Sequence, residues 1–231
     1  MARKPPRPAS ASAGQDRDKS ERERIIDAFM KLLAEKPIEQ IGFAEIAREA
    51  GVSLSALRES FGSALAILAA HMKAIDRAVL AGGDADVAGE PPRERLFDVL
   101  MRRLDVLEPH KAAVRSLMRS AMRDPPLALA LNGLAVRSQQ WMLTAADIGA
   151  AGPRGMLRAQ GLAVLFASVL RTWVDDDDPG HARTMAALDR ALARGQRWSG
   201  FLDDLCRIPR CVARARRPRR RDTDGEETVA A

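Results

Sequence analysis

The segment from Gly42 to Phe61 constrains the fold more than any other part of this 231-residue sequence. Its spacing predicts two short helices, over residues 43–50 and about 54–60, that cross at a tight turn. Gly51 stands where such a turn requires a left-handed backbone. Small or apolar residues occupy the positions that would pack the two helices together: Ile46, Ala47, Ala50, Val52 and Leu57. This arrangement is typical of a helix-turn-helix.

A helix-turn-helix presents the start of its second helix to duplex DNA. Ser53 is placed to cap that helix, and the free N–H groups and positive dipole there suit a phosphate. Arg58 is the side chain best able to reach a guanine edge or a phosphate, and Arg48 can contact the backbone. The candidate DNA-binding residues are Phe43, Ala44, Arg48, Gly51, Val52, Ser53, Leu54, Ser55, Ala56, Arg58 and Phe61. A helical corner without DNA contact is the alternative.

The rest of the chain is also predicted to be helical. Aromatic residues make up 4% of the sequence and Tyr is missing, whereas strands favour aromatic and β-branched residues. A capping box at Ser20–Glu23 starts the first helix, and Pro37 ends it. Ser63 can cap a fourth helix. Further helices are predicted over about 93–108, 109–123, 127–146 and 154–174, and from Asp178, with Pro179 in the first turn, to about 194. The expected fold class is all-α.

Residues 20–75 resemble the TetR family of bacterial transcriptional regulators. The resemblance rests on the capped first helix, on Phe43-Ala-Glu-Ile-Ala-Arg-Glu-Ala-Gly-Val-Ser53, and on Phe61-Gly-Ser63 before a helix that opens at Ala64-Leu65. It implies a homodimer in which a small ligand binds the C-terminal helices, shifts the fourth helix and spreads the two DNA-reading heads. The implied partners are a double-stranded DNA operator and a small apolar effector. No cofactor is expected.

Two positions depart from the family pattern. Leu57-Arg58 stands where the family usually has an apolar residue followed by Tyr, and Ala64 stands where a phosphate-contacting Lys is common. Arg58 is a candidate to replace one of the two contacts. Because each phosphate contact contributes close to one unit to the slope of affinity against salt, their loss would flatten that slope.

The resemblance also implies a domain organisation. We expect a disordered basic arm at 1–19, a helix-turn-helix domain at 20–66, a helical ligand-binding and dimerisation domain at 67–212, and a disordered Arg-rich tail at 213–231. The candidate ligand-pocket residues are Met101, Leu104, Met118, Met122 and Trp141, with gap filling as the alternative role for the methionines. In the family the last two long helices pair with those of a second copy. The candidate dimer-seam residues, all from the helix predicted over about 154–174, are Leu162, Leu165, Phe166, Val169 and Trp173; core or interface packing is favoured for them, with a ligand box as the alternative.

A second resemblance concerns residues 171–190. They are similar to the end of the ubiquinone-biosynthesis accessory proteins, which have a TetR-like fold, have lost DNA binding, carry lipid and sit on membranes through a terminal amphipathic helix. In this chain residues 197–221 could make such a peripheral membrane contact, because apolar residues there precede a run with eight Arg between 207 and 221. The net charge of +6 suits either polyanionic partner, DNA or membrane.

Other classes of protein are disfavoured. The three histidines, His71, His110 and His181, are scattered, and neither a nucleophile elbow nor a phosphate-binding loop occurs, so an enzyme is not expected. Cys206 and Cys211 fall on different faces of a helix, and Asp175–Asp178 is read as a loop and cap, so no metal site is predicted. No apolar signal region or membrane-spanning run is present, which favours a cytoplasmic protein.

Overall fold

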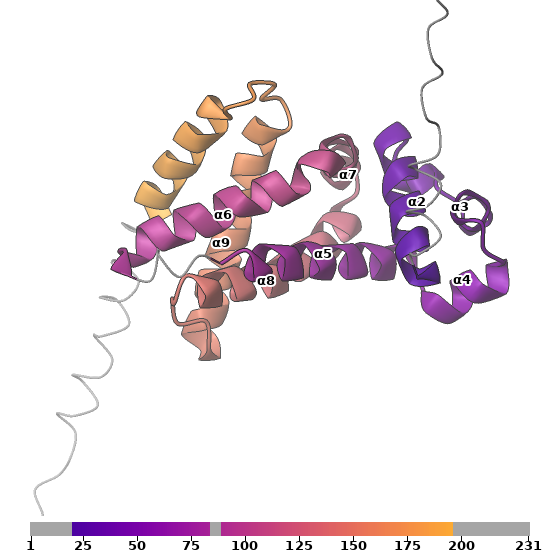
Figure 1. Ribbon diagram of the computed structural model, residues 1–231, viewed down its shortest axis with the longest axis horizontal. Helices are drawn as coiled ribbons and strands as arrows, with labels where there is room; N and C mark the ends of the chain where they lie inside the picture. The colour runs from indigo at the N-terminus through magenta and orange to yellow at the C-terminus, as the bar shows by residue number, and fades with distance from the viewer. Residues whose placement is uncertain (1–19, 84–88, 196–231) are drawn as a thin grey trace, which may run out of the picture. The chain divides into compact units, whose positions relative to one another are not determined.

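The computed structural model describes residues 20–83 and 89–195, and within these ranges the regular structure is helical (Figure 1). The predicted all-α fold class is therefore confirmed. The elements, in chain order, are α2 (Glu21–Glu35), η1 (Ile38–Gln40), α3 (Phe43–Ala50), α4 (Leu54–Ser60), α5 (Ala64–Ala81), α6 (Pro92–Leu107), η3 (Glu108–His110), α7 (Lys111–Arg123), α8 (Pro125–Ala145) and α9 (Gly152–Trp173). Residues 182–195 are also helical.

Side-chain caps start α2, α4 and α5 where the sequence predicts, whereas α8 begins two residues before its predicted start at 127. The Ser20 side chain accepts a hydrogen bond from the backbone of Glu23, and the Glu23 carboxylate accepts one from the Ser20 N–H, which completes the capping box of α2. Ser53 and Ser63 cap α4 and α5 in the same manner. Asp124 caps α8, whose first residues are prolines. Local sequence thus determines these boundaries.

Two hydrophobic clusters lie within the compact unit that ends at Leu192. One cluster gathers α2, α3 and α4, together with Ala113 of α7. The other gathers α6, α8, α9 and the helical stretch that contains Leu188. α5 contributes to both, with Ile67 in the first cluster and Ile75 in the second. Figure 1 shows α5 passing from α2–α4 to α6 and α8.

α7 packs along α2 and joins the helix-turn-helix region to the rest of the unit. The hydroxyl of Ser116 donates to the backbone oxygen of Lys36 at 3.1 Å. One turn further along α7, Ser120 donates to the carboxylate of Glu39 in η1 at 2.9 Å. A movement of α7 would therefore be passed directly to the segment that precedes α3.

α8 and α9 form an antiparallel pair. The side-chain amides of Asn132 and Gln160 exchange two hydrogen bonds, of 3.0 and 3.1 Å. Nearer the turn between the helices, Gln140 of α8 approaches Met156 of α9 at 4.0 Å. These two contacts fix the register of the pair.

The acidic run after α9 forms a loop and cap, but the next helix starts later than predicted. Asp176 accepts hydrogen bonds from the backbone and the hydroxyl of Thr184, at 2.9 and 2.6 Å. Asp178 accepts from the backbone of Gly180 and Ala182. Helical structure begins at residue 182, so Pro179 lies in the loop and not in the first helical turn.

Several predictions fall on residues outside the described ranges. They are the basic arm at 1–19, the amphipathic segment at 197–221, both cysteines and the Arg-rich tail. Among the described helices, none combines the length and the apolar character that crossing a membrane requires.

Candidate functional site

The predicted helix-turn-helix has the geometry that its sequence demands. Gly51 ends α3 in the left-handed conformation with φ of 65°, and the Val52 N–H donates to the oxygen of Ala47 at 3.0 Å. Ile46 and Leu57 are buried between the two helices, and Val52 is partly buried against them. The corner is thus rigidly packed, and α4 is held by its inner face.

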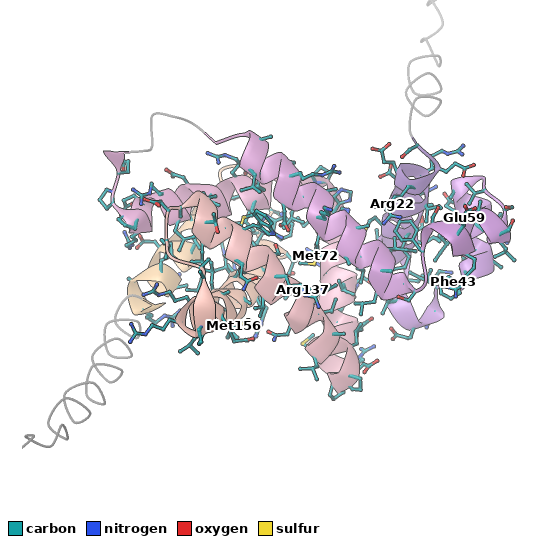
Figure 2. The ribbon with its side chains drawn as sticks, turned by 90° about the horizontal axis from the view of Figure 1, so that it is seen from below. Arg22, Phe43, Glu59, Met72, Arg137 and Met156 are labelled. Atoms are coloured by element: carbon teal, nitrogen blue, oxygen red, sulfur yellow. The ribbon has the colours of Figure 1, made fainter. Side chains whose placement is uncertain are left out.

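The outer face of α3 and α4 carries several of the predicted contact residues. Leu54 and Phe43 expose 56% and 49% of their surface, and Phe43 lies at the edge of this region in Figure 2. The Ser53 hydroxyl accepts the Ala56 N–H at 3.1 Å and lies 2.8 Å from the hydroxyl of Ser55. The first turn of α4 therefore presents small polar groups and one exposed leucine, which leaves room for close approach to a groove.

The two predicted arginines occupy different surroundings. Arg48 is exposed and lies 4.0 Å from Glu45. A hydrogen bond from Lys36, at 2.5 Å, lowers the pKa of that Glu45 carboxyl, so the acid remains charged. Arg58 is exposed and folds back toward the α4–α5 corner, where a Cβ added at Gly62 would lie 3.4 Å from its Nη1. Arg58 thus extends beyond the end of α4.

Phe61 has a packing role in this structure. Its ring is 4% exposed, because it belongs to the cluster under the helix-turn-helix. Arg22 of α2 was not among the predicted residues, yet its guanidinium lies 4.1 Å from the centroid of that ring. Arg22 also donates to the backbone oxygen of Ser60 at 2.8 Å. It therefore holds the C-terminal end of α4, and no local sequence pattern reveals this contact across 38 residues.

A buried polar cluster lies among α5, α6 and α8, and it too was not predicted. Asp76 accepts from Nη1 of Arg103 at 2.5 Å and from the hydroxyl of Ser138 at 2.6 Å. Sδ of Met142 lies 3.6 Å from the same Nη1. Gln139, next to Ser138, is almost fully buried. The sequence feature that points to this cluster is Arg103, a charged residue within the apolar stripe of α6.

A pair of histidines connects α5 with η3. The rings of His71 and His110 meet edge to face with 4.5 Å between centroids. Burial, and then the neighbouring His110, lowers the pKa of His71 to about 4. Burial also lowers the pKa of His110. Among the described residues no group of three or more potential ligands could hold a metal ion.

The five predicted ligand-pocket residues differ widely in burial, and their role in a pocket stays a prediction. Leu104 is fully buried, and Met101 and Met118 pack partly buried against the same core. Met122 is 76% exposed in the last turn of α7, and Trp141 is 57% exposed on the outer face of α8. Trp141 instead lines a surface groove of about 540 Å³ at the turn between α8 and α9.

The five predicted dimer-seam residues face the interior of their own chain. Leu162, Phe166, Val169 and Trp173 are buried in the core cluster, and Leu165 packs against it. This packing is what core residues of a single chain show, and the dimer seam itself stays a prediction. Periodicity finds the strongest apolar stripe but does not say whether that stripe packs within one chain or between two. The exposed apolar residues on the outer faces of α8 and α9 are Leu129, Trp141, Met156, Leu157 and Val164.

Comparisons with known proteins agree with this architecture. No family model and no curated protein matches the chain. Among solved structures, a TetR transcriptional regulator from Nitrosomonas europaea superposes with a TM-score of 0.60 at 22% identity, over 76% of this chain and 97% of its own. A regulator from Rhodococcus sp. RHA1 gives 0.52 at 21% identity, over 76% of this chain and 95% of its own.

A TetR-family regulator from Streptomyces coelicolor is similar over a longer part of the chain. Its TM-score is 0.50 at 18% identity, with 87% of this chain and 90% of its own covered. Each similarity is structural, because the identities are low. The chain therefore has the fold of the TetR-family transcriptional regulators.

Proposed function

We propose that this protein is a homodimeric transcriptional repressor that binds duplex DNA through α4 and is released by a small ligand bound among its C-terminal helices. The observation that carries the proposal is the exposed first turn of α4 above a buried, capped corner. Leu54 and Ser55 are exposed there, whereas Leu57 anchors the opposite face. Such a helix can enter the major groove without losing its own packing.

Arg58 is assigned to the DNA backbone. Because its guanidinium folds back beside Gly62, it lies past the C-terminal end of α4 and away from the first turn that would face the bases. A phosphate contact at this place would compensate for Ala64, which cannot make one. Arg22 supports the interface indirectly, since it holds the end of α4 through Ser60.

The homodimer is assigned to the outer faces of α8 and α9. Leu157, Gly161 and Val164 follow at helical spacing on the exposed side of α9, and no atom lies within 4 Å of a Cβ added at Gly161. Gly133 of α8 is similarly open. Small residues between larger apolar ones let the helices of a second copy approach closely.

Two structural connections would transmit the effect of ligand binding to the DNA-binding helices. α5 continues from the α4 corner into the second core, and α7 is bonded to Lys36 and Glu39 through Ser116 and Ser120. A ligand that favours one arrangement of α5 and α7 would change the separation of the two α4 helices in a dimer.

Selection from a random duplex library tests this function without knowledge of the operator. With the full chain at low salt, we expect enrichment of a palindromic site whose half-sites lie about one helical turn apart. Ser55→Glu should abolish enrichment, because it places a negative charge against the DNA. Ala186→Glu, which adds the same charge at an exposed position far along the chain, should leave enrichment intact.

No enrichment by the wild type would contradict DNA binding. Mass spectrometry of the same preparation then examines the lipid-carrier alternative: a co-purified lipid, together with liposome binding that is lost when residues 197–221 are removed, would favour the accessory-protein function.

A further inference from the structure

We propose that Leu54, the first residue of α4, reads the 5-methyl group of a thymine in each half-site of the DNA. The first turn of α4 would then select a T·A pair by apolar contact and not through a charged side chain. This inference rests on the proposed function, DNA binding through α4, and deepens it by naming the base and the group that are recognised.

The outer face of α4 is formed by its four exposed residues. Leu54 and Arg58 are four positions apart, as are Ser55 and Glu59, so each pair follows one row along the helix. Leu57 is 2% exposed and anchors the opposite face in the core. The rotation of α4 about its own axis is therefore fixed, and DNA that meets this helix meets these four side chains.

The charged groups of this face lie in the second half of α4. Arg58 folds back toward Gly62, and Glu59, labelled in Figure 2, follows it directly. Helices of this kind contact base edges chiefly with their N-terminal residues. Reading of the bases by α4 therefore depends on a first turn that carries no charge.

Within that first turn, Leu54 is the side chain that reaches furthest. Its neighbours are Ser53, Ser55 and Ala56, and all three are shorter than leucine. The two hydroxyls already have partners in the cap, because the Ser53 oxygen accepts the Ala56 N–H at 3.1 Å and lies 2.8 Å from the Ser55 oxygen. Leu54, in contrast, exposes 56% of its surface.

An exposed leucine in the major groove distinguishes thymine from the other bases. Thymine carries a methyl group at C5 on its major-groove edge, whereas the other bases present hydrogen-bond donors and acceptors there. Leu54 placed against such a polar edge would cover a donor or acceptor without replacing its bond to water, which is unfavourable. Placed against the methyl group, it would bury apolar surface on both sides.

The size of the effect follows from the burial of one methyl group. That burial corresponds to about fourfold in affinity. Because a homodimer reads two half-sites, removal of the methyl group from both should weaken binding by about 15-fold.

Replacement of thymine by deoxyuridine tests the inference, because deoxyuridine lacks only the 5-methyl group and pairs with adenine in the same way. The DNA is the duplex that the full chain enriches most from the random library. Each T·A pair is replaced in turn, at the symmetric positions of both half-sites, and the Kd is measured by fluorescence anisotropy at one salt concentration. For the wild type we expect one position at which deoxyuridine lowers affinity by about 15-fold.

Leu54→Ala should bind thymine and deoxyuridine equally at that position, because alanine is too short to reach the methyl group. Circular dichroism should show unchanged helical content, since Leu54 is exposed and lies outside the core. Leu80→Ala is the matched control. It makes the same change at a leucine of α5 that is 37% exposed and outside the helix-turn-helix, and it should keep the full discrimination.

Two results would overturn the inference alone: an enriched site at which no thymine position discriminates, and discrimination that persists in Leu54→Ala. The second would assign the methyl contact to another side chain, such as the exposed Phe43. The wild-type comparison still tests the contact if Leu54→Ala binds no duplex. A wild type that enriches no duplex at all would reject the proposed function and this inference with it.

Discussion

Asp76 of α5 and Arg103 of α6 form an ion pair inside the protein, with 2.5 Å between Oδ1 and Nη1 and side-chain exposures of 12% and 4%. Ser138 of α8 adds a third group to the same carboxylate. Removing two charges from water is costly, so such a pair adds little net stability over apolar residues of the same size. We expect it to favour one arrangement of α5, α6 and α8, because a shifted helix would leave a buried charge alone.

Breaking this pair from one side should be strongly destabilising. Asp76→Asn leaves the guanidinium of Arg103 buried without a counter-charge, and we expect the free energy of unfolding to fall by about 3–5 kcal/mol. Urea denaturation measures it. Asp98→Asn, at an exposed position on α6, should change it by no more than about 0.5 kcal/mol.

The double variant Asp76→Met/Arg103→Met separates the effect of the charges on stability from the effect of side-chain packing at the two positions. Because it removes both charges, it should be markedly more stable than Asp76→Asn. A double variant as unstable as the single one would mean that packing, and not charge, explains the loss.

Arg58→Ala tests the assignment of Arg58 to a phosphate. Operator affinity should fall by about 1–3 kcal/mol, and the slope of log affinity against log salt should decrease by about 0.9 for each arginine lost, or about 2 for a dimer. The loss should be similar on operator and on unrelated duplexes. A loss confined to the operator, with the salt slope unchanged, would assign Arg58 to a base edge instead.

The helix-turn-helix was predictable because its determinants are local. The turn at Gly51, the cap at Ser53 and the capping box of Ser20 each depend on residues within four positions of one another. The cap at Ser53 and the capping box of Ser20 rest on side-chain hydrogen bonds, and the turn at Gly51 rests on its left-handed backbone. The same holds for α3 and α4, whose observed bounds match the predicted helices over 43–50 and about 54–60.

The C-terminal sites were less predictable because they depend on contacts between distant residues. The amphipathic pattern of α9 identifies Phe166 and Trp173 as apolar positions, but the same pattern suits a core and a dimer seam. The pairing of Asp76 with Arg103 spans 27 residues. Only the packing of α5 against α6 brings these side chains together, so neither residue alone indicates a buried ion pair.

Val164→Glu tests the outer face of α9 as the dimer surface. Val164 is exposed in the single chain, so the charge should not unfold it, but a second copy would bury it against apolar residues. We expect analytical ultracentrifugation to give a dimer for the wild type and a monomer for the variant, each with the same helical content. Phe166→Glu should instead unfold the chain, because Phe166 is buried. A Val164→Glu protein that remains dimeric would place the interface elsewhere.

The histidine pair between α5 and η3 makes stability depend on pH. Burial, then the charge of His110 and, less, that of Arg103, outweigh the opposing effect of Asp27 and together lower the pKa of His71 to about 4. The unfolded chain takes up a proton at this residue near its ordinary pKa of 6.5, whereas the folded chain does not until about 4.

Stability should therefore be fully present above about pH 6.5 and should fall as the pH decreases toward 4, by about 3 kcal/mol from His71 alone. His110, whose pKa is also lowered, adds to the loss in the same direction. His71→Phe keeps a ring against His110 but cannot take up a proton. Urea denaturation at pH 7 and pH 5 should give a clearly smaller difference for this variant than for the wild type, and equal differences would mean that other groups cause the acid sensitivity.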